Sequence, residues 1–327
     1  MKSNGELQNK NFMNIIFIGT PEFGAIILNG LLINSSNYKP ILVITTPDKP
    51  VGREQTLTPP PVKVIARKYK IPIEQPEKLQ VISYKLQDLK PDLIIVAAYS
   101  QILPKSILDI PRYGCLNIHP SLLPKYRGPS PIQYAILNGD EETGVTIIKM
   151  TDKIDAGPIV AYKNFAINEK VNYVDLENKL ANLGLKLLIE TIPKLINRKI
   201  KPIPQNNSKA TFTKILAKEN GKINWQKTAE EIERQIRAFT PWPGAFTLWQ
   251  KDGKLLRIKI LNGRVYKFQQ EFVYVIGRTL VVPQNEIAVQ CGKDYLVIEK
   301  LQLEGKKEMK SEDFMRGHPD FIGTILK

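Results

Sequence analysis

An uninterrupted apolar run, Leu93-Ile94-Ile95-Val96-Ala97-Ala98, is the stretch of this sequence that decides the fold. A strand that is apolar at every position has no side that faces water, so this run predicts a central strand buried on both faces of a sheet. Shorter apolar segments lie on either side of it in the chain. They predict further strands at residues 14–19, 41–45, 115–119 and 145–150.

Amphipathic segments separate these strands. Apolar residues recur at helical spacing in residues 22–33, 62–69, 76–89 and 129–137, and a longer helix is expected at 174–196. Strands that alternate with helices are typical of a mostly parallel sheet covered on both faces. We therefore expect an α/β domain over residues 12–197.

The composition changes after residue 197. Residues 198–208 are rich in Lys, Pro, Asn and Gln without usable periodicity, and we expect a linker at 198–211. Residues 212–327 begin with one expected helix at 229–239. Short alternating stretches follow at 246–250, 255–261, 279–282, 287–291 and 295–303. Many short strands joined by turns indicate a small antiparallel β-barrel.

The overall composition is that of a globular protein, with 43% hydrophobic and 24% charged residues in 327. Residues 1–11 are polar and lack the apolar stretch of an export signal, and no apolar run reaches the roughly 18 residues that a membrane helix needs. We expect no membrane segment and a cytoplasmic location. Only Cys115 and Cys291 occur, which predicts neither a disulfide framework nor a zinc site, and we expect no metal.

The formal net charge is +15, and the positive charge is concentrated after Asn197. A polyanion such as RNA is one partner that this charge would suit. A generally basic set of cellular proteins, or solubility alone, would explain it equally well.

Asn117 and His119 lie at the end of an expected strand, before a loop rich in proline. Ligands bind at the carboxyl ends of strands in open α/β sheets, and residues two apart on a strand face the same side. Both polar groups are therefore expected to face one crevice. The alternative is a histidine that only bonds the backbone at a strand end.

An acidic residue follows the next expected strand, again at a carboxyl end, and either Asp152 or Asp155 fits this position. A carboxylate there could orient the imidazole and stabilise its protonated form. Either aspartate could instead be a turn residue. Asn, His and Asp include no strong nucleophile, so the set indicates proton transfer and stabilisation of an oxyanion.

The segment Ser121-Leu122-Leu123-Pro124-Lys125-Tyr126-Arg127-Gly128-Pro129-Ser130-Pro131-Ile132, after Asn117-Ile118-His119, resembles the formyltransferases that use 10-formyltetrahydrofolate. Asp155-Ala156-Gly157 matches the downstream Asp-x-Gly of that family, which favours Asp155 over Asp152. The resemblance implies that Asn117, His119 and Asp155 are catalytic. It also implies a folate pocket formed by Ser121, Leu122, Leu123 and Pro124.

Three further segments are similar to the methionyl-tRNA formyltransferases within that family. They are Thr46-Pro47-Asp48-Lys49-Pro50-Val51-Gly52-Arg53, Arg237-Ala238-Phe239-Thr240-Pro241-Trp242-Pro243-Gly244-Ala245, and Leu301-Gln302-Leu303-Glu304-Gly305-Lys306-Lys307 with Asp313-Phe314. The resemblance implies a Rossmann-like catalytic domain followed by an OB-type barrel that binds tRNA, with the Arg53 loop as a contact. Lys306 and Lys307 are further candidates for tRNA contact in the basic second part of the chain, although paired lysines on a barrel loop are more often merely solvated. Glu54-Gln55-Thr56 replace the basic pair that often follows the loop arginine in the family.

The implied reaction transfers a formyl group from 10-formyltetrahydrofolate to initiator methionyl-tRNA and gives N-formylmethionyl-tRNA for translation initiation. We expect a monomer. Two other classes remain as rivals. A formyltransferase with a small acceptor would share the three polar residues but not need a basic barrel, and a non-catalytic RNA-binding module would explain the charge but not those residues.

Overall fold

The computed structural model describes residues 13–52, 54–267 and 275–327. These residues form two compact units. The first unit contains the chain up to residue 127 together with residues 144–165 and 177–212. The second unit contains residues 128–143, 166–176 and 213–327. The chain therefore passes between the units at several points.

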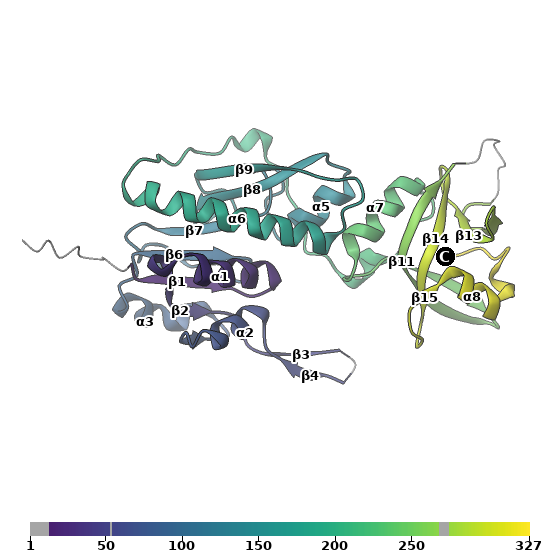
Figure 1. Cartoon of the computed structure of the whole chain (residues 1–327), viewed down its shortest axis with the longest axis horizontal. Helices are drawn as coiled ribbons and strands as arrows, with labels where there is room; N and C mark the ends of the chain where they lie inside the picture. The colour runs from purple at the N-terminus through teal and green to yellow at the C-terminus, as the bar shows by residue number, and fades with distance from the viewer. Residues whose placement is uncertain (1–12, 53, 268–274) are drawn as a thin grey trace, which may run out of the picture. The chain divides into compact units, whose positions relative to one another are not determined.

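The first unit is built on a mostly parallel sheet with the order β5-β2-β1-β6-β7-β8-β9 (Figure 1). Its strands are β1 (Ile15–Gly19), β2 (Pro40–Ile44), β5 (Ile73–Glu74), β6 (Leu93–Ala97), β7 (Cys115–His119), β8 (Glu142–Lys149) and β9 (Ile159–Ala166). Neighbouring strands from β5 to β7 are parallel, whereas β8 runs antiparallel to β7. The predicted Rossmann-like fold class is confirmed.

The apolar strands lie at the centre of this sheet, as predicted. Every residue of β1 and β6 is buried, because helices cover both faces. The helices α1 (Glu22–Asn34) and α6 (Tyr173–Ile196) lie on one face (Figure 1). They approach so closely that a side chain at Gly30 of α1 would meet Leu185 of α6 at 2.0 Å. Leu86 of α3 (Ser83–Asp88) and Ile107 of α4 (Lys105–Leu108) pack into the core cluster on the other face.

The strand order reverses between β1 and β6, since the chain continues from β1 to β2 on one side and from β6 to β7 on the other. Such a reversal opens a crevice at the carboxyl ends of the strands, where ligands of α/β proteins bind. β7 ends at the same edge because it is parallel to β6. The topology therefore leads the polar end of β7 towards this crevice.

The helix predicted at residues 76–89 is shorter than expected. It starts with the 3-10 turn η2 (Leu79–Ile82) and continues as α3. The Gln101 side chain explains the difference, since its oxygen accepts the Leu79 N–H at 2.9 Å and its amide donates to the carbonyls of Pro76 and Glu77. These bonds satisfy the backbone of residues 76–79 without a helix.

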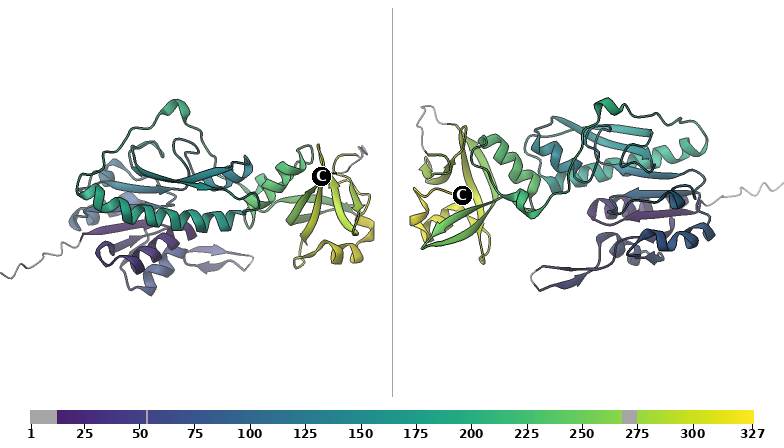
Figure 2. Two further views of the ribbon diagram at one scale, coloured as in Figure 1. Left: turned by 45° about the horizontal axis from the view of Figure 1, so that its top comes forward. Right: turned by 180° about the vertical axis from the view of Figure 1, so that it is seen from behind.

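A β-hairpin formed by β3 (Lys49–Val51) and β4 (Thr56–Thr58) extends from the first unit before α2 (Pro61–Lys68), as two views show (Figure 1, Figure 2). All residues of both strands are exposed. Arg53, predicted to contact tRNA, falls between the two strands and lies outside the described residues.

The second unit contains an antiparallel sheet, which in the described part of the chain has the order β10-β11-β14-β13-β12 with β15 on β14. The strands are β10 (Phe246–Lys251), β11 (Lys254–Tyr266), β12 (Thr279–Val282), β13 (Glu286–Gln290), β14 (Tyr295–Leu303) and β15 (Met309–Lys310). The sheet curls around a core in which Trp249, Phe314 and Phe321 meet edge to face. This agrees with the predicted small antiparallel barrel domain.

Three helices belong to the second unit: α5 (Pro131–Leu137), α7 (Ala229–Phe239) and α8 (Ser311–Gly317). A capping box fixes the start of α7, because Thr228 and Glu231 each bond the backbone N–H of the other. Short 3-10 turns are η1 (Ser36–Tyr38), η3 (Asn207–Lys209), η4 (Lys218–Gly221) and η5 (Pro319–Phe321). Among the residues described, no helix has the length and apolar character needed to cross a bilayer.

Candidate active site

Asn117 and His119 both lie on β7, next to the carboxyl end of β6. The register pairs Asn117 with Val96 of β6 and with Ile148 of β8, so Asn117 has a strand on each side. His119 is only 4% exposed and Asn117 is half-buried. The strand thus fixes the position of the Asn117 amide relative to the His119 imidazole.

Asp155 reaches these residues by a route that the strand pattern did not predict. The expectation that the strand before it ends at the same edge of the sheet is wrong, because β8 is antiparallel to β7 and its last residue, Lys149, pairs with Leu116. The loop that follows closes on itself through a 3.0 Å bond from Lys149 N–H to the Pro158 carbonyl. A side chain at Gly157 would lie 1.9 Å from the Lys149 carbonyl oxygen, so this tight loop needs glycine there.

The loop brings the Asp155 carboxylate against both polar residues of β7. Asn117 Nδ2 donates to Asp155 Oδ1 at 3.1 Å, and His119 Nδ1 lies 3.7 Å from Asp155 Oδ2. Asp152, the alternative from the sequence, is exposed. The structure therefore brings together the three residues that the sequence analysis proposed as catalytic.

The orientation of the His119 ring is set by a backbone carbonyl. His119 Nε2 lies 2.9 Å from the carbonyl oxygen of Tyr126. A carbonyl only accepts hydrogen bonds, so Nε2 carries a hydrogen and Nδ1 is the nitrogen that gains or loses a proton. That nitrogen faces Asp155, which makes the pair suited to hold and release one proton.

The loop Ser121–Pro124 follows β7 and is anchored at alternate residues. Ser121 and Leu123 are buried, and the Thr146 hydroxyl of β8 donates to the Ser121 carbonyl at 2.7 Å and accepts the Leu123 N–H at 3.1 Å. Leu122 and Pro124 are partly exposed. The buried residues therefore fix the loop, and the exposed ones are available to a ligand.

Residues of the predicted linker 198–211 also belong to the site, which the sequence analysis missed. Gln205 Nε2 donates to the carbonyls of Asp155 at 2.8 Å and Gly157 at 2.7 Å. Its Oε1 accepts from Arg127 Nε and Nη2 at 3.1 and 2.8 Å. Thr211 Oγ1 accepts the Tyr126 N–H at 2.8 Å. No periodic signal could have found these residues, because each acts through single amide or hydroxyl contacts.

Two residues that follow the carboxyl ends of β1 and β6 in the chain, Thr20 and Tyr99, have buried hydroxyls without a hydrogen-bond partner among the described residues. Burial raises the pKa of Tyr99 to about 12, so its hydroxyl stays protonated at neutral pH. The ring of Tyr99 packs against the core cluster under the sheet. Tyr99 therefore packs its ring in the core and keeps a neutral hydroxyl there.

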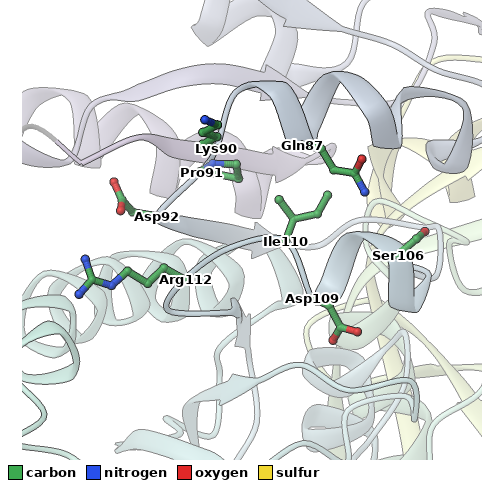
Figure 3. A pocket seen from close by; sticks show the side chains of 8 residues that line it. All are labelled: Gln87, Lys90, Pro91, Asp92, Ser106, Asp109, Ile110 and Arg112. Carbon is green, nitrogen blue, oxygen red and sulfur yellow. The ribbon is translucent and has the colours of Figure 1, made fainter.

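A hollow of about 560 Å³ lies elsewhere on the first unit (Figure 3). It lies where β6 and β7 begin, and so at the edge of the sheet opposite to their carboxyl ends. The residues that line it are Gln87, Lys90, Pro91, Asp92, Ser106, Asp109, Ile110 and Arg112. None of the candidate catalytic residues lines this hollow.

The remaining predicted site residues lie in the second unit. Lys306 and Lys307 are exposed in the turn between β14 and β15. Among the described residues, no group of three or more His, Cys, Asp or Glu side chains could hold a metal ion.

Comparison with known proteins identifies the family of the chain. A family model described as formyl transferase matches residues 13–192, and one described as formyl transferase, C-terminal domain, matches residues 215–319. Among curated proteins, methionyl-tRNA formyltransferase of Bacillus velezensis is 44% identical over 315 residues, covering 95% of this chain and 97% of that protein.

Solved structures share the fold. Methionyl-tRNA formyltransferase from Clostridium thermocellum has a TM-score of 0.55 at 22% identity, covering 78% of this chain and 94% of that one. HypX from Aquifex aeolicus in complex with tetrahydrofolic acid has a TM-score of 0.60 at 17% identity, covering 95% of this chain and 47% of that one. The full-length similarity to curated relatives decides the assignment: the chain belongs to the methionyl-tRNA formyltransferase family.

Proposed function

We propose that the protein transfers the formyl group of 10-formyltetrahydrofolate to the free amino group of initiator methionyl-tRNA, giving N-formylmethionyl-tRNA for translation initiation. The observation that carries this proposal is the contact of Asp155 with both Asn117 and His119, at the start of the anchored loop Ser121–Pro124. The family to which the chain belongs supports the same reaction.

Folate would bind beside β7, at the loop Ser121–Pro124. The half-exposed side chains of Leu122 and Pro124 offer apolar surface to a flat ring, and the buried partners keep the loop in place before binding. A loop that is already ordered loses little conformational entropy when a ligand binds.

Formyl transfer begins when the neutral amine of methionyl-tRNA attacks the formyl carbon. The new C–N bond pushes an electron pair onto the formyl oxygen, which becomes an oxyanion. The Asn117 amide has two N–H groups, and within the described part of the chain one of them bonds Asp155. We assign the other N–H to the oxyanion, where one well-placed donor typically contributes about a hundred- to a thousandfold in rate.

A proton must then move from the attacking amine to the folate nitrogen. The tetrahedral intermediate collapses when the bond between the formyl carbon and that nitrogen breaks and its electron pair returns to nitrogen. We propose that His119 Nδ1 and Asp155 take up the amine proton and return it to the leaving nitrogen through water. The Tyr126 carbonyl keeps the ring oriented for this exchange.

The two parts of the chain would divide the work. We propose that residues 12–197 form the catalytic domain, residues 198–211 connect it, and residues 212–327 bind tRNA. The excess of positive charge after residue 197 supports this division, because phosphate contacts dominate RNA affinity. Arg53, Lys306 and Lys307 are the proposed tRNA contacts. We propose that the protein acts as a monomer in the cytoplasm. Sedimentation at the protein concentration of the assay measures the oligomeric state.

One set of assays tests the reaction. The protein is incubated with 10-formyltetrahydrofolate and either methionyl-tRNA, free methionine amide or an amino sugar nucleotide, and formylated product is measured. Transfer to methionyl-tRNA alone is the expected result. Transfer mainly to the amino sugar would favour a small-acceptor enzyme, and tight tRNA binding without any transfer would favour an RNA-binding module.

The catalytic assignment is tested by Asn117→Ala and His119→Ala. Each should lower kcat at least a hundredfold while tRNA affinity stays within about twofold, because the oxyanion donor and the proton carrier are lost. Asn182→Ala, at an exposed position of α6, is the matched control and should be fully active. A loss of less than about tenfold in both site variants would remove them from the mechanism.

A further inference from the structure

Gln205 connects the Asp155 loop to the loop that holds His119. Its Nε2 donates to the carbonyls of Asp155 and Gly157, at 2.8 and 2.7 Å. Its Oε1 accepts two N–H groups of Arg127, at 3.1 and 2.8 Å. The Gln205 side chain therefore donates to one segment, at residues 155–157, and accepts from another, at Arg127.

Arg127 fixes the other end of this connection. It is only 5% exposed, and besides Gln205 its Nη2 donates to Asn207 Oδ1 at 2.8 Å. The preceding residue, Tyr126, supplies the carbonyl that accepts from His119 Nε2. A guanidinium that is buried and bonded in this way has little freedom to rotate. The carbonyl that orients His119 is thus attached to a rigid anchor.

These contacts form a closed ring. Starting at His119, it passes through the Tyr126 carbonyl to Arg127, then through Gln205 to the Asp155 backbone, and returns from the Asp155 carboxylate to His119 Nδ1. Removing one member opens the ring. The separation between imidazole and carboxylate then depends on the two loops themselves and on the bond from Asn117 to Asp155.

We infer that Gln205 is a positioning residue of formyl transfer, which sets the separation and orientation of Asp155 relative to His119. The inference rests on the roles proposed above for Asn117, His119 and Asp155. Asp155 has a positive φ of 47°, which is uncommon for a residue with a side chain. The Gln205 bond to the Asp155 carbonyl helps to hold the backbone in this conformation.

The substitution Gln205→Glu separates the two sides of the connection. A carboxylate oxygen still accepts from Arg127, and its negative charge strengthens that contact, so the link to Arg127 is kept. The donor side is lost, because a carboxylate has no hydrogen to offer the Asp155 and Gly157 carbonyls and its oxygen repels theirs. Misplacement of a reacting group by about 1 Å costs on the order of a hundredfold in rate.

The expected result is a fall in kcat of about ten- to a hundredfold, with KM for methionyl-tRNA within about twofold of the unchanged protein. The pH profile of kcat is compared in the uncharged variant Gln205→Asn, where no new charge acts on the pair; it should shift, because proton transfer by His119 depends on its separation from Asp155. A residue that only supported the fold would lower the transition temperature and leave the pH profile unchanged.

Gln235→Glu is the matched control. Gln235 is 7% exposed in α7 and also donates its amide to two backbone carbonyls, those of Asn220 at 3.1 Å and Lys222 at 3.3 Å. The same substitution there removes the same kind of bonds outside the proposed site. It should lower the transition temperature and leave kcat and its pH profile unchanged below the transition.

If Gln205→Glu does not fold, Gln205→Asn is measured in its place. Its amide is one methylene shorter and cannot span both sides, so a reduced kcat is again expected. Normal kcat and pH profile in the variant that folds would overturn the inference, as would losses equal to those of Gln235→Glu. Asn117→Ala is measured alongside: if it is inactive while the Gln205 variants are fully active, only this inference fails, and if it is active, the proposed site itself fails.

Discussion

Thr146→Val is the sharpest test of the loop proposed to bind folate. Thr146 is fully buried in β8, and its hydroxyl donates to the Ser121 carbonyl at 2.7 Å and accepts the Leu123 N–H at 3.1 Å. Valine has nearly the same shape but cannot make either bond. The substitution therefore leaves one buried acceptor and one buried donor unpaired while it preserves the packing.

The expected magnitude follows from these two bonds. A buried polar group left without a partner costs about 1–3 kcal/mol, so Thr146→Val should lower the free energy of unfolding by roughly 2–6 kcal/mol. A domain of this size loses about 2–4 °C in transition temperature per kcal/mol, which gives a fall of at least about 4 °C. The loosened loop should also raise KM for 10-formyltetrahydrofolate about tenfold, equivalent to about 1.4 kcal/mol.

Thermal unfolding and steady-state kinetics with varied folate measure the two effects. Thr191→Val is the matched control, because among the residues described the buried Thr191 hydroxyl of α6 bonds the Leu187 carbonyl alone, one turn back in the same helix, at 2.6 Å. It should cost less than about 1 kcal/mol and leave KM unchanged. A folate KM for Thr146→Val within twofold of normal, despite a lower transition temperature, would refute the assignment of this loop to folate.

Three further predictions concern the loop glycine, the thiols and the tRNA surface. Gly157→Ala should lower kcat at least tenfold, since a Cβ would lie 1.9 Å from a backbone oxygen, whereas Gly317→Ala has no neighbour within 4 Å and should be neutral; kcat of the folded variants decides. Burial raises the pKa of Cys115 and Cys291 to about 12, so both thiols are neutral at pH 8 and iodoacetamide should label them only after unfolding; rapid labelling of the native protein would contradict this. Replacing both lysines of the β14–β15 turn by alanine should weaken tRNA binding and reduce its dependence on salt; an unchanged salt slope in a binding titration would exclude them.

The central strands could be predicted from the sequence because a strand buried on both faces is apolar at every position. The run that starts at Leu93 has no polar position, and a strand with this pattern lies in the interior of an α/β sheet. The pair Asn117 and His119 could also be found, since alternation along β7 puts both on one side. In both cases the signal lies within a short window of sequence.

The direction of β8 could not be predicted in this way. An apolar strand shows the same pattern whether it runs parallel or antiparallel to its neighbour, so the sequence did not reveal that Lys149 ends beside the start of β7. The contact of Asp155 with Asn117 depends on a loop that folds back, and its glycine at 157 is a local sign of that turn but not of its direction. The family resemblance, and not periodicity, selected Asp155 over Asp152.

The role of residues 198–211 was hidden for a different reason. A segment that contributes single side-chain contacts needs no apolar periodicity and has the composition of a linker. Gln205 and Thr211 make their bonds to Arg127, Asp155 and Tyr126, which lie about 50 to 85 residues earlier. Only the three-dimensional structure joins such distant residues.

Backbone conformation gives an independent reason to regard these contacts as part of the site. Tyr126 and Asp155 both have positive φ, 62° and 47°, where a residue with a side chain is strained by about 1–3 kcal/mol. Each is fixed by a group from outside its own loop, since Thr211 accepts the Tyr126 N–H and Gln205 donates to the Asp155 carbonyl.

Strain of this kind persists only where contacts with the surroundings stabilise the backbone by more than relaxation would release. If these bonds are removed, relaxation of Tyr126 turns the carbonyl that orients His119, and relaxation of Asp155 turns the carboxylate that faces it. Both movements change the same separation between imidazole and carboxylate. The segment 198–211 is therefore expected to affect formyl transfer without touching either substrate, and a variant there should lose kcat before it loses affinity.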